Sequence, residues 1–255
     1  MSNPQNIAQM SPDDVQALDN VLADTSVNGV TRRALIGRAA ATAAIASAAA
    51  SAALPGTALA MGSASAVGAL IDTAVTAEAL AVTYLTGLIE NASKTGVTKF
   101  VPILKAINAA EYDHYKALKS LGAKPVTTKF WAPDAIFKPG NVFPTLEAFE
   151  TLFVDAYLIG VTTFVKAGKA DYARYAGEIG GVEAQHLALA RFAENKLPND
   201  RSFQSYAIKD LGGIVKAIEK AGIGLGKQGA KPGKFYSFSP PPGSALASIT
   251  NNSPQ

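Results

Sequence analysis

The chain has 255 residues, of which 48% are hydrophobic and only 8% aromatic, and its formal net charge is +3. This composition is typical of helical proteins with Ala- and Leu-rich cores, and the length allows one or two domains. A small positive charge without a basic run interleaved with aromatics argues against nucleic acid as a partner. Because the chain has no cysteine, disulfides contribute nothing to its stability in any compartment.

The N-terminal segment has the order of an export signal. A polar stretch over 1–30 leads to Arg32 and Arg33, followed by an Ala-rich run over 39–53 and by small residues up to Ala60. A charged region, an apolar region and a small-x-small site make up a secretory signal peptide, and the paired arginines resemble the twin-arginine signal of bacteria. We therefore expect cleavage after Ala60, the twin-arginine translocase as a partner during export, and a periplasmic or secreted mature protein. A membrane anchor is the alternative, but a run of mostly Ala and Ser is a poor spanning helix, so we expect no stable membrane insertion.

Four amphipathic helices are predicted after this segment, because apolar residues recur there at helical spacing and glycines stand at the breaks. The first two are predicted over 66–93 and 98–121. A proline-rich, irregular stretch over 123–143 separates them from two more helices over 144–168 and 171–195. Two short-looped helical hairpins joined by one long crossover form the topology of a ferritin-like four-helix bundle.

The C-terminal part is predicted to hold a fifth amphipathic helix over 205–221 and an irregular, flexible tail over 222–255. Within the tail, residues 224–229 match a dinucleotide-binding fingerprint by letter. They follow a helix rather than a strand, so we expect a flexible linker there. The predicted divisions of the chain are a signal peptide over 1–60, a helical bundle over 61–197 and a C-terminal helix with tail over 198–255.

The two histidines of the chain each follow a glutamate by three residues. Glu111 precedes His114 on the second predicted helix, and Glu183 precedes His186 on the fourth. A spacing of three on an α-helix puts both side chains on one face, one turn apart. Two helices that each present a carboxylate and an imidazole inward can share a pair of metal ions, as in di-iron and di-manganese bundles. Chance pairing on two helix surfaces is the alternative, and the use of both histidines disfavours it.

The two predicted hairpins repeat with a shift of 72 residues, the shift from Glu111 to Glu183. The same shift maps Glu78 on the first helix onto Glu150 on the third, and these two residues would supply the remaining carboxylates. Asp155 is the rival ligand on the third helix. Because five residues turn about 140° around a helix, Glu150 and Asp155 cannot both face one site, and we favour Glu150.

Together these residues predict a site for two metal ions. The candidate ligands are Glu78, Glu111, His114, Glu150, Glu183 and His186. Glu111 and Glu183 would bridge the ions, each histidine would bind one ion as a neutral imidazole, and the outer two glutamates would complete the site. Four carboxylates balance two divalent ions, which permits burial. The mixture of nitrogen and carboxylate oxygen suits Fe or Mn, so we expect two Fe or Mn ions as cofactors.

The region 66–195 resembles the ferritin-like domain of exported bacterial proteins related to desiccation-associated ferritin-like proteins. The segment Val182–His186, followed by Leu189 and Ala190, is similar to that family's closing Val-Glu-Ala-x-His segment. Gly160–Phe164 resembles its Gly-Val-x-x-Tyr segment on the third helix. Three residues before the Gly-Val pair the family has a glutamate, and this chain has Tyr157.

The resemblance implies an all-α fold, a ferritin-like four-helix bundle, here with a fifth C-terminal helix. It implies an exported protein with a di-iron or di-manganese carboxylate centre, acting in iron or peroxide handling or in stress (desiccation) protection. Oxygen or peroxide would be its small-molecule partner, with ferroxidase-like or peroxidase- or catalase-like activity, and the resemblance leaves a homo-oligomer open. The departure at Tyr157 keeps a metal-free structural or protective bundle as the alternative.

Overall fold

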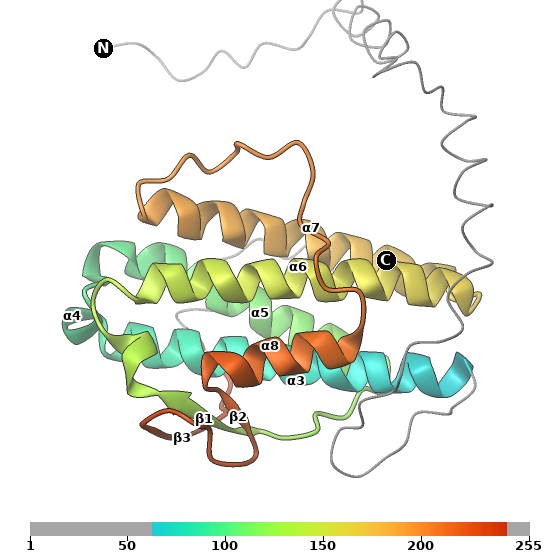
Figure 1. Cartoon of the computed structure of the whole chain (residues 1–255), viewed down its shortest axis with the longest axis horizontal. Helices are drawn as coiled ribbons and strands as arrows, with labels where there is room; N and C mark the ends of the chain where they lie inside the picture. Colours follow the sequence, from blue (N-terminus) through green and yellow to red (C-terminus); the bar gives the residue numbers. More distant parts are fainter. Residues whose placement is uncertain (1–62, 244–255) are drawn as a thin grey trace, which may run out of the picture. The chain divides into compact units, whose positions relative to one another are not determined.

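Four long helices form a bundle in the computed structural model, which describes residues 63–243 (Figure 1). They are α3 (Ser63–Glu90), α5 (Val101–Ser120), α6 (Val142–Lys166) and α7 (Ala170–Ala193). Helix α3 pairs with α5 and α6 pairs with α7, so the chain makes two helical hairpins joined by a long crossover. The predicted all-α bundle with an additional C-terminal helix is thus confirmed. The predicted signal peptide over 1–60 lies outside the described residues.

The breaks between the paired helices follow from local backbone chemistry. The first predicted helix ends at Glu90 rather than at 93, and the chain continues into the short helix α4 (Ala92–Thr95). Gly96 closes α4 with a φ of 77°, a left-handed conformation that glycine adopts without steric cost. A 3-10 turn, η3 (Thr98–Phe100), then precedes α5, whose first turn contains a proline. Proline is tolerated there because its missing N–H has no partner within the helix.

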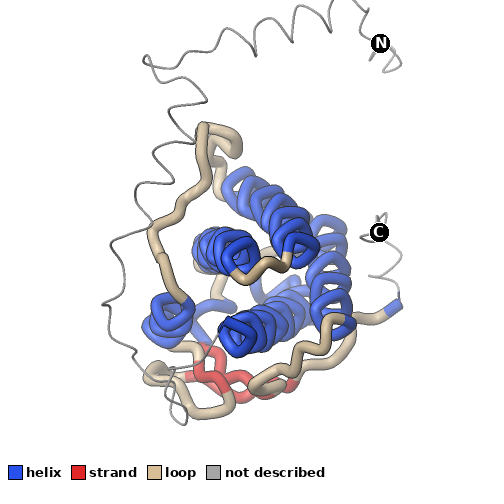
Figure 2. Tube along the Cα trace, turned by 90° about the vertical axis from the view of Figure 1, so that its right-hand side faces the viewer, coloured by secondary structure: helices blue, strands red, loops and turns tan. Residues whose placement is uncertain are grey.

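The crossover between the hairpins was predicted to be irregular, but it contains regular structure. It contains strand β1 (Lys129–Pro133) and a 3-10 turn, η4 (Asp134–Phe137). Strand β1 lies between β2 (Gly224–Leu225) and β3 (Gly233–Ser237) in an antiparallel sheet of order β2-β1-β3. Figure 2 shows this sheet at one edge of the bundle. The prediction of an irregular tail from residue 222 was therefore wrong as far as Ser237, where β3 ends.

The glycine-rich segment over 224–229, which was predicted to be a flexible linker, contains strand β2 and folds back tightly on itself after it. A Cβ atom on Gly224 would lie 2.0 Å from the carbonyl oxygen of Lys227, and one on Gly229 would lie 2.1 Å from that of Gly222. No side chain fits at such distances. The glycines are thus explained by close approach of the backbone to itself.

The fifth helix, α8 (Leu211–Ala221), begins six residues later than predicted. Asp210 ends the extended segment before it and caps the helix, because its side chain accepts a hydrogen bond of 2.9 Å from the N–H of Gly213. Helix α8 packs on α6 and buries Ile214, Val215 and Ile218. It therefore covers one side of the bundle (Figure 1).

Two bundle helices are apolar enough to cross a membrane by length and composition, namely Ala66–Glu90 and Val142–Lys166. Core helices of bundles have the same property, and 61% and 50% of their most apolar windows are buried inside the fold. Each also carries a buried glutamate, Glu78 and Glu150. Their apolar character is therefore only a weak indication of membrane insertion.

Candidate metal centre

The six candidate ligands meet in the middle of the bundle, one or two from each long helix. They are Glu78 on α3, Glu111 and His114 on α5, Glu150 on α6, and Glu183 and His186 on α7. All six are buried, and the most accessible of them, His114, is only 8% exposed. We refer to these residues as the Glu/His cluster. Apolar residues of all four helices surround it and keep it from bulk water.

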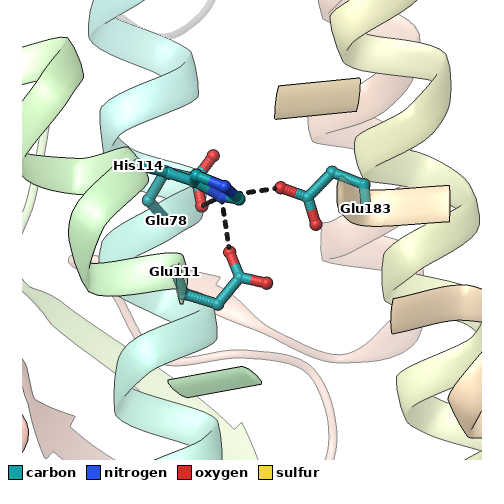
Figure 3. Close-up of side chains that lie close together, drawn as sticks. All are labelled: Glu78, Glu111, His114 and Glu183. Carbon is teal, nitrogen blue, oxygen red and sulfur yellow. Dashed lines mark ion pairs between the residues drawn. The ribbon is translucent and has the colours of Figure 1, made fainter. Parts of the chain in front are cut away.

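The Glu/His cluster consists of two overlapping groups whose ligand atoms lie within 4.8 Å of one another. One group is Glu78, Glu111, His114 and Glu183, and the other is Glu111, Glu150, Glu183 and His186. Glu111 and Glu183 belong to both groups, and we call them the central glutamates. Figure 3 shows the first group, in which the imidazole of His114 lies between carboxylates from both hairpins.

The two halves of the cluster are related by the 72-residue repeat. The Nδ1 atom of His114 lies 3.0 Å from Glu183 on the opposite hairpin and 3.6 Å from Glu111 on its own helix. The corresponding distances from the Nδ1 atom of His186 are 2.8 Å to Glu111 and 3.4 Å to Glu183. The residues related by the sequence repeat are thus arranged near-symmetrically in space.

Helix α6 contributes Glu150 to the cluster and directs Asp155 elsewhere. A carboxylate oxygen of Glu150 lies 3.9 Å from Nδ1 of His186. Asp155 is buried as well, but its carboxylate accepts a hydrogen bond of 2.9 Å from the backbone N–H of Ile208. Asp155 therefore holds the extended segment before α8 against the bundle, and it belongs to neither group of candidate ligands.

Many polar atoms of the cluster contact only one another, as imidazole–carboxylate ion pairs, and make no hydrogen bond with the other residues that the structure describes. They are Oε2 of Glu78 and Glu150, both carboxylate oxygens of Glu111 and Glu183, and Nδ1 of His114 and His186. Buried polar atoms nearly always have hydrogen-bond partners, so four buried carboxylates that share only two imidazoles need an explanation. Coordination of metal ions would satisfy all of them at once, and this set of donors fits Fe or Mn.

Burial and mutual repulsion determine the protonation of the metal-free cluster. Burial, together with the charges of the central glutamates, raises the pKa of Glu78 and of Glu150 well above the ordinary value. Burial also opposes ionisation of Glu111, but its two imidazole neighbours hold its pKa well below that value. Burial disfavours the charged form of His186, yet contact with the central glutamates raises its pKa from 6.5 to about 9. The metal-free cluster therefore holds protons that bound cations would displace.

Tyr157 is the residue near the cluster whose contact the sequence analysis missed. Its hydroxyl donates a hydrogen bond to Oε1 of Glu78, and its ring is buried on α6. Burial, together with the nearby carboxylates, raises its pKa well above the ordinary value, so the hydroxyl keeps its proton. Tyr157 lies seven residues, or two turns, after Glu150, so helical spacing alone places it on the same face.

Other buried polar side chains fix the helices that carry the cluster. The hydroxyl of Tyr84 donates a hydrogen bond of 3.0 Å to the carbonyl oxygen of Ile136, which ties the crossover to α3. The amide of Asn108 donates one of 3.1 Å to the hydroxyl of Thr86, which links α5 to α3. The first bond fixes α3 against the crossover, and the second fixes α5 against α3 at a position three residues before Glu111.

Comparison with known families agrees with this geometry. The family model described as a ferritin-like domain matches residues 68–196. The match begins inside α3, runs through α5, α6 and α7, and includes every residue of the Glu/His cluster. No curated protein and no solved structure matched the chain in two further comparisons.

Proposed function

Because the chain belongs to the ferritin-like domain family, we propose that its buried cluster binds two ions of iron or manganese. The proposed ligands are Glu78, Glu111, His114, Glu150, Glu183 and His186. One observation carries the proposal, namely that buried oxygen and nitrogen atoms without hydrogen-bond partners outside the cluster converge in two overlapping groups. Four carboxylates would balance two divalent charges, so the loaded cluster would be neutral and stable in the core.

Each residue has a distinct part in this proposal. The central glutamates would contact both ions, because they belong to both groups. His114 and His186 would each bind one ion through Nδ1 as neutral imidazoles. Bound iron or manganese would supply redox chemistry toward oxygen or peroxide. The surrounding helices would exclude bulk water and keep the carboxylates in place.

We further propose that the protein oxidises Fe(II) or removes peroxide, and that it acts in iron or peroxide handling or in stress (desiccation) protection. The donor set of the cluster supports the proposed activity toward Fe(II) or peroxide. The proposed role in stress protection rests on the resemblance to exported bacterial ferritin-like proteins. Export through the twin-arginine translocase, supported by the order of residues around Arg32 and Arg33, would place the protein in the periplasm or outside the cell.

A metal-free structural bundle is the second candidate, and one contact favours it. The hydroxyl of Tyr157 already donates a hydrogen bond to one oxygen of Glu78. At the position of Tyr157 the family that the chain resembles has a further glutamate. In such a protein the two imidazoles, held in their charged form by the central glutamates, would partly offset the buried carboxylates.

Anaerobic loading with Fe(II), followed by exposure to oxygen or peroxide, separates the two candidates. We expect saturable Fe(II) oxidation by the wild-type protein, and binding weakened at least about tenfold in His114→Ala and His186→Ala. Glu178→Gln changes an exposed glutamate on α7 outside the cluster and is the matched control. Oxidation by the wild-type protein no faster than by the histidine variants would favour the metal-free bundle.

A further inference from the structure

A cavity of about 70 Å³ lies beside the Glu/His cluster. Its wall is almost entirely apolar and consists mainly of side chains from α3, α6, α7 and α8. Glu78 and Tyr157 belong to this wall, whereas Glu150 and the central glutamates do not. The cavity therefore reaches the cluster on the side of Glu78.

Small residues in the wall make room for the cavity on this side of the bundle. Under the 72-residue repeat, the wall residues Ala77 and Ala156 correspond to Phe149 and Tyr84 of the other half. Those two rings are buried and contact each other edge to face, with centroids 5.7 Å apart. Some wall residues are instead larger than their equivalents and fill part of this space, namely Phe153 for Ala81 and Phe164 for Ala92. Because protein interiors are close-packed, the space that remains is a specific difference between the two halves.

The polarity and the size of the cavity limit what it can hold. The hydroxyl of Thr76 in the wall donates a hydrogen bond of 2.6 Å to the carbonyl oxygen of Asp72 and accepts one of 2.9 Å from the N–H of Val126. A polar molecule would thus lose its hydrogen bonds to water along this wall and gain few in return. The volume is roughly half that of an apolar cavity of about 150 Å³ that binds benzene or xenon, so it suits an apolar molecule of very few atoms.

The solvent side of the cavity lies close to the cluster. Val126, which lines the cavity, is 67% exposed, and its N–H bonds to Thr76, two residues before Glu78 on α3. Glu78 itself is only 1% exposed. A small apolar molecule therefore has a short path from solvent to Glu78 and Tyr157.

We propose that this cavity takes up dioxygen and delivers it to the Glu78 side of the cluster, and that it excludes hydrogen peroxide. Dioxygen is small and apolar, so it matches both the volume and the wall, whereas hydrogen peroxide would lose its hydrogen bonds to water. The proposal rests on the proposed metal centre, where Fe(II) would be oxidised and dioxygen reduced. It selects one of the two oxidants, and it makes the two ion positions unequal, because of the outer glutamates only Glu78 borders the cavity.

Methyl NMR of the full protein without added metal, under increasing dioxygen pressure, tests the uptake. Dissolved dioxygen is paramagnetic and speeds the relaxation of protons that it approaches. We expect this enhancement to be several-fold larger at Ala176 and Ile214, which are buried in the wall, than at Leu104 and Leu146, which are buried outside it. Equal enhancement in the two pairs would overturn the proposal.

Filling the cavity tests the delivery. Ala156→Leu adds an isopropyl group to the wall on α6 and should slow Fe(II) oxidation by dioxygen about tenfold, without changing oxidation by hydrogen peroxide under anaerobic conditions. Ala148→Leu, at an exposed position of α6 outside the wall, should leave both rates unchanged. If Ala156→Leu does not fold, Ala77→Leu adds the same group to the wall on α3, with Ala66→Leu as its exposed control.

The two measurements separate this proposal from the proposed function. Equal slowing of both oxidations in the wall variants would overturn the proposal, because the cavity would then admit polar and apolar oxidants alike. Selective relaxation at Ala176 and Ile214 without any Fe(II) oxidation would refute only the proposed activity of the cluster. Fe(II) oxidation by dioxygen without selective relaxation, or at equal rates in wall variants and controls, would refute only the role of the cavity.

Discussion

Tyr157 on α6 donates a hydrogen bond to Glu78 on α3. The residue that the 72-residue repeat places opposite Tyr157 is Leu85, which has no hydroxyl to give to Glu150. The two halves of the Glu/His cluster are therefore alike in their histidine and glutamate distances but differ in this contact. Of the two outer glutamates, only Glu78 therefore has a tyrosine hydroxyl as a donor.

Tyr157→Phe should lower the stability of the protein and the metal affinity of one of the two proposed ion positions. The change keeps the ring and leaves an oxygen of Glu78 without its donor, which should cost about 1–3 kcal/mol of unfolding free energy. Loss of this orienting bond should also lower the affinity for the ion next to Glu78 about tenfold and leave the affinity for the ion next to Glu150 unchanged. Denaturant unfolding and stepwise Mn(II) titration would measure the two effects.

Tyr84→Phe is the matched control for that change, because its hydroxyl bonds to the crossover rather than to the cluster. It should lower stability without altering either metal affinity. Equal weakening of both ions in Tyr157→Phe would show that the hydrogen bond does not act through Glu78.

Glu150→Gln and Asp155→Asn should have opposite effects on metal binding and on the segment before α8. Glu150→Gln keeps the volume and removes one proposed ligand charge, so metal affinity should fall at least about tenfold. Asp155→Asn should leave metal content unchanged and loosen the segment that it holds through Ile208. Metal analysis and hydrogen exchange at Ile208 would test both. An empty site in Asp155→Asn with a full one in Glu150→Gln would reverse the assignment on α6.

The parts of the fold that depend on local periodicity were predictable from the sequence. Apolar spacing gave the four bundle helices, and the repeat brought Glu78 and Glu150 to the same level of the core. The sheet was missed because β1 pairs with strands about a hundred residues away, and short glycine-rich strands carry no periodic signal of their own.

The remaining differences also have physical causes. The start of α8 was placed too early because the backbone of Ile208 bonds to Asp155, a tertiary contact that no local pattern records. The contact of Tyr157 was missed although its spacing from Glu150 was readable. A tyrosine on a core-facing helix usually contributes only hydrophobic packing. Its hydrogen bond to Glu78 became evident only when the structure placed the two side chains together.

Stability of the metal-free protein should fall as pH rises from 6.5 to 9. The pKa of His186 is raised from 6.5 to about 9, so the folded state binds the extra proton and its contribution is complete below pH 6.5. That contribution is lost as pH rises through 9, and the raised pKa values of Glu78 and Glu150 act in the same direction. The lowered pKa of Glu111 affects stability only at acid pH.

Calorimetric melting with a chelator and with Mn(II) would check this dependence. With Mn(II) present the decline should disappear, because the imidazoles are then neutral ligands, and metal affinity should increase over the same range as protons are released. A melting temperature of the metal-free protein that increases from pH 6.5 to 9 would contradict the assignment of protons to the cluster.

Replacing Arg32 and Arg33 together by lysine should leave unprocessed precursor in the cytoplasm of a bacterial host with a twin-arginine system. The wild-type protein should be exported and begin at Met61, after cleavage following Ala60. Fractionation and N-terminal sequencing would measure both. Exported protein that still begins at Met1 or Ser2 would refute the signal-peptide interpretation.

The metal content of the full wild-type protein after anaerobic reconstitution with Fe(II) or Mn(II) tests the central proposal most directly. Elemental analysis should find about two ions per chain, as expected for two overlapping groups that share the central glutamates. Less than about half an equivalent per chain would contradict a binuclear centre and leave a bundle whose buried carboxylates are balanced by protons and imidazoles alone.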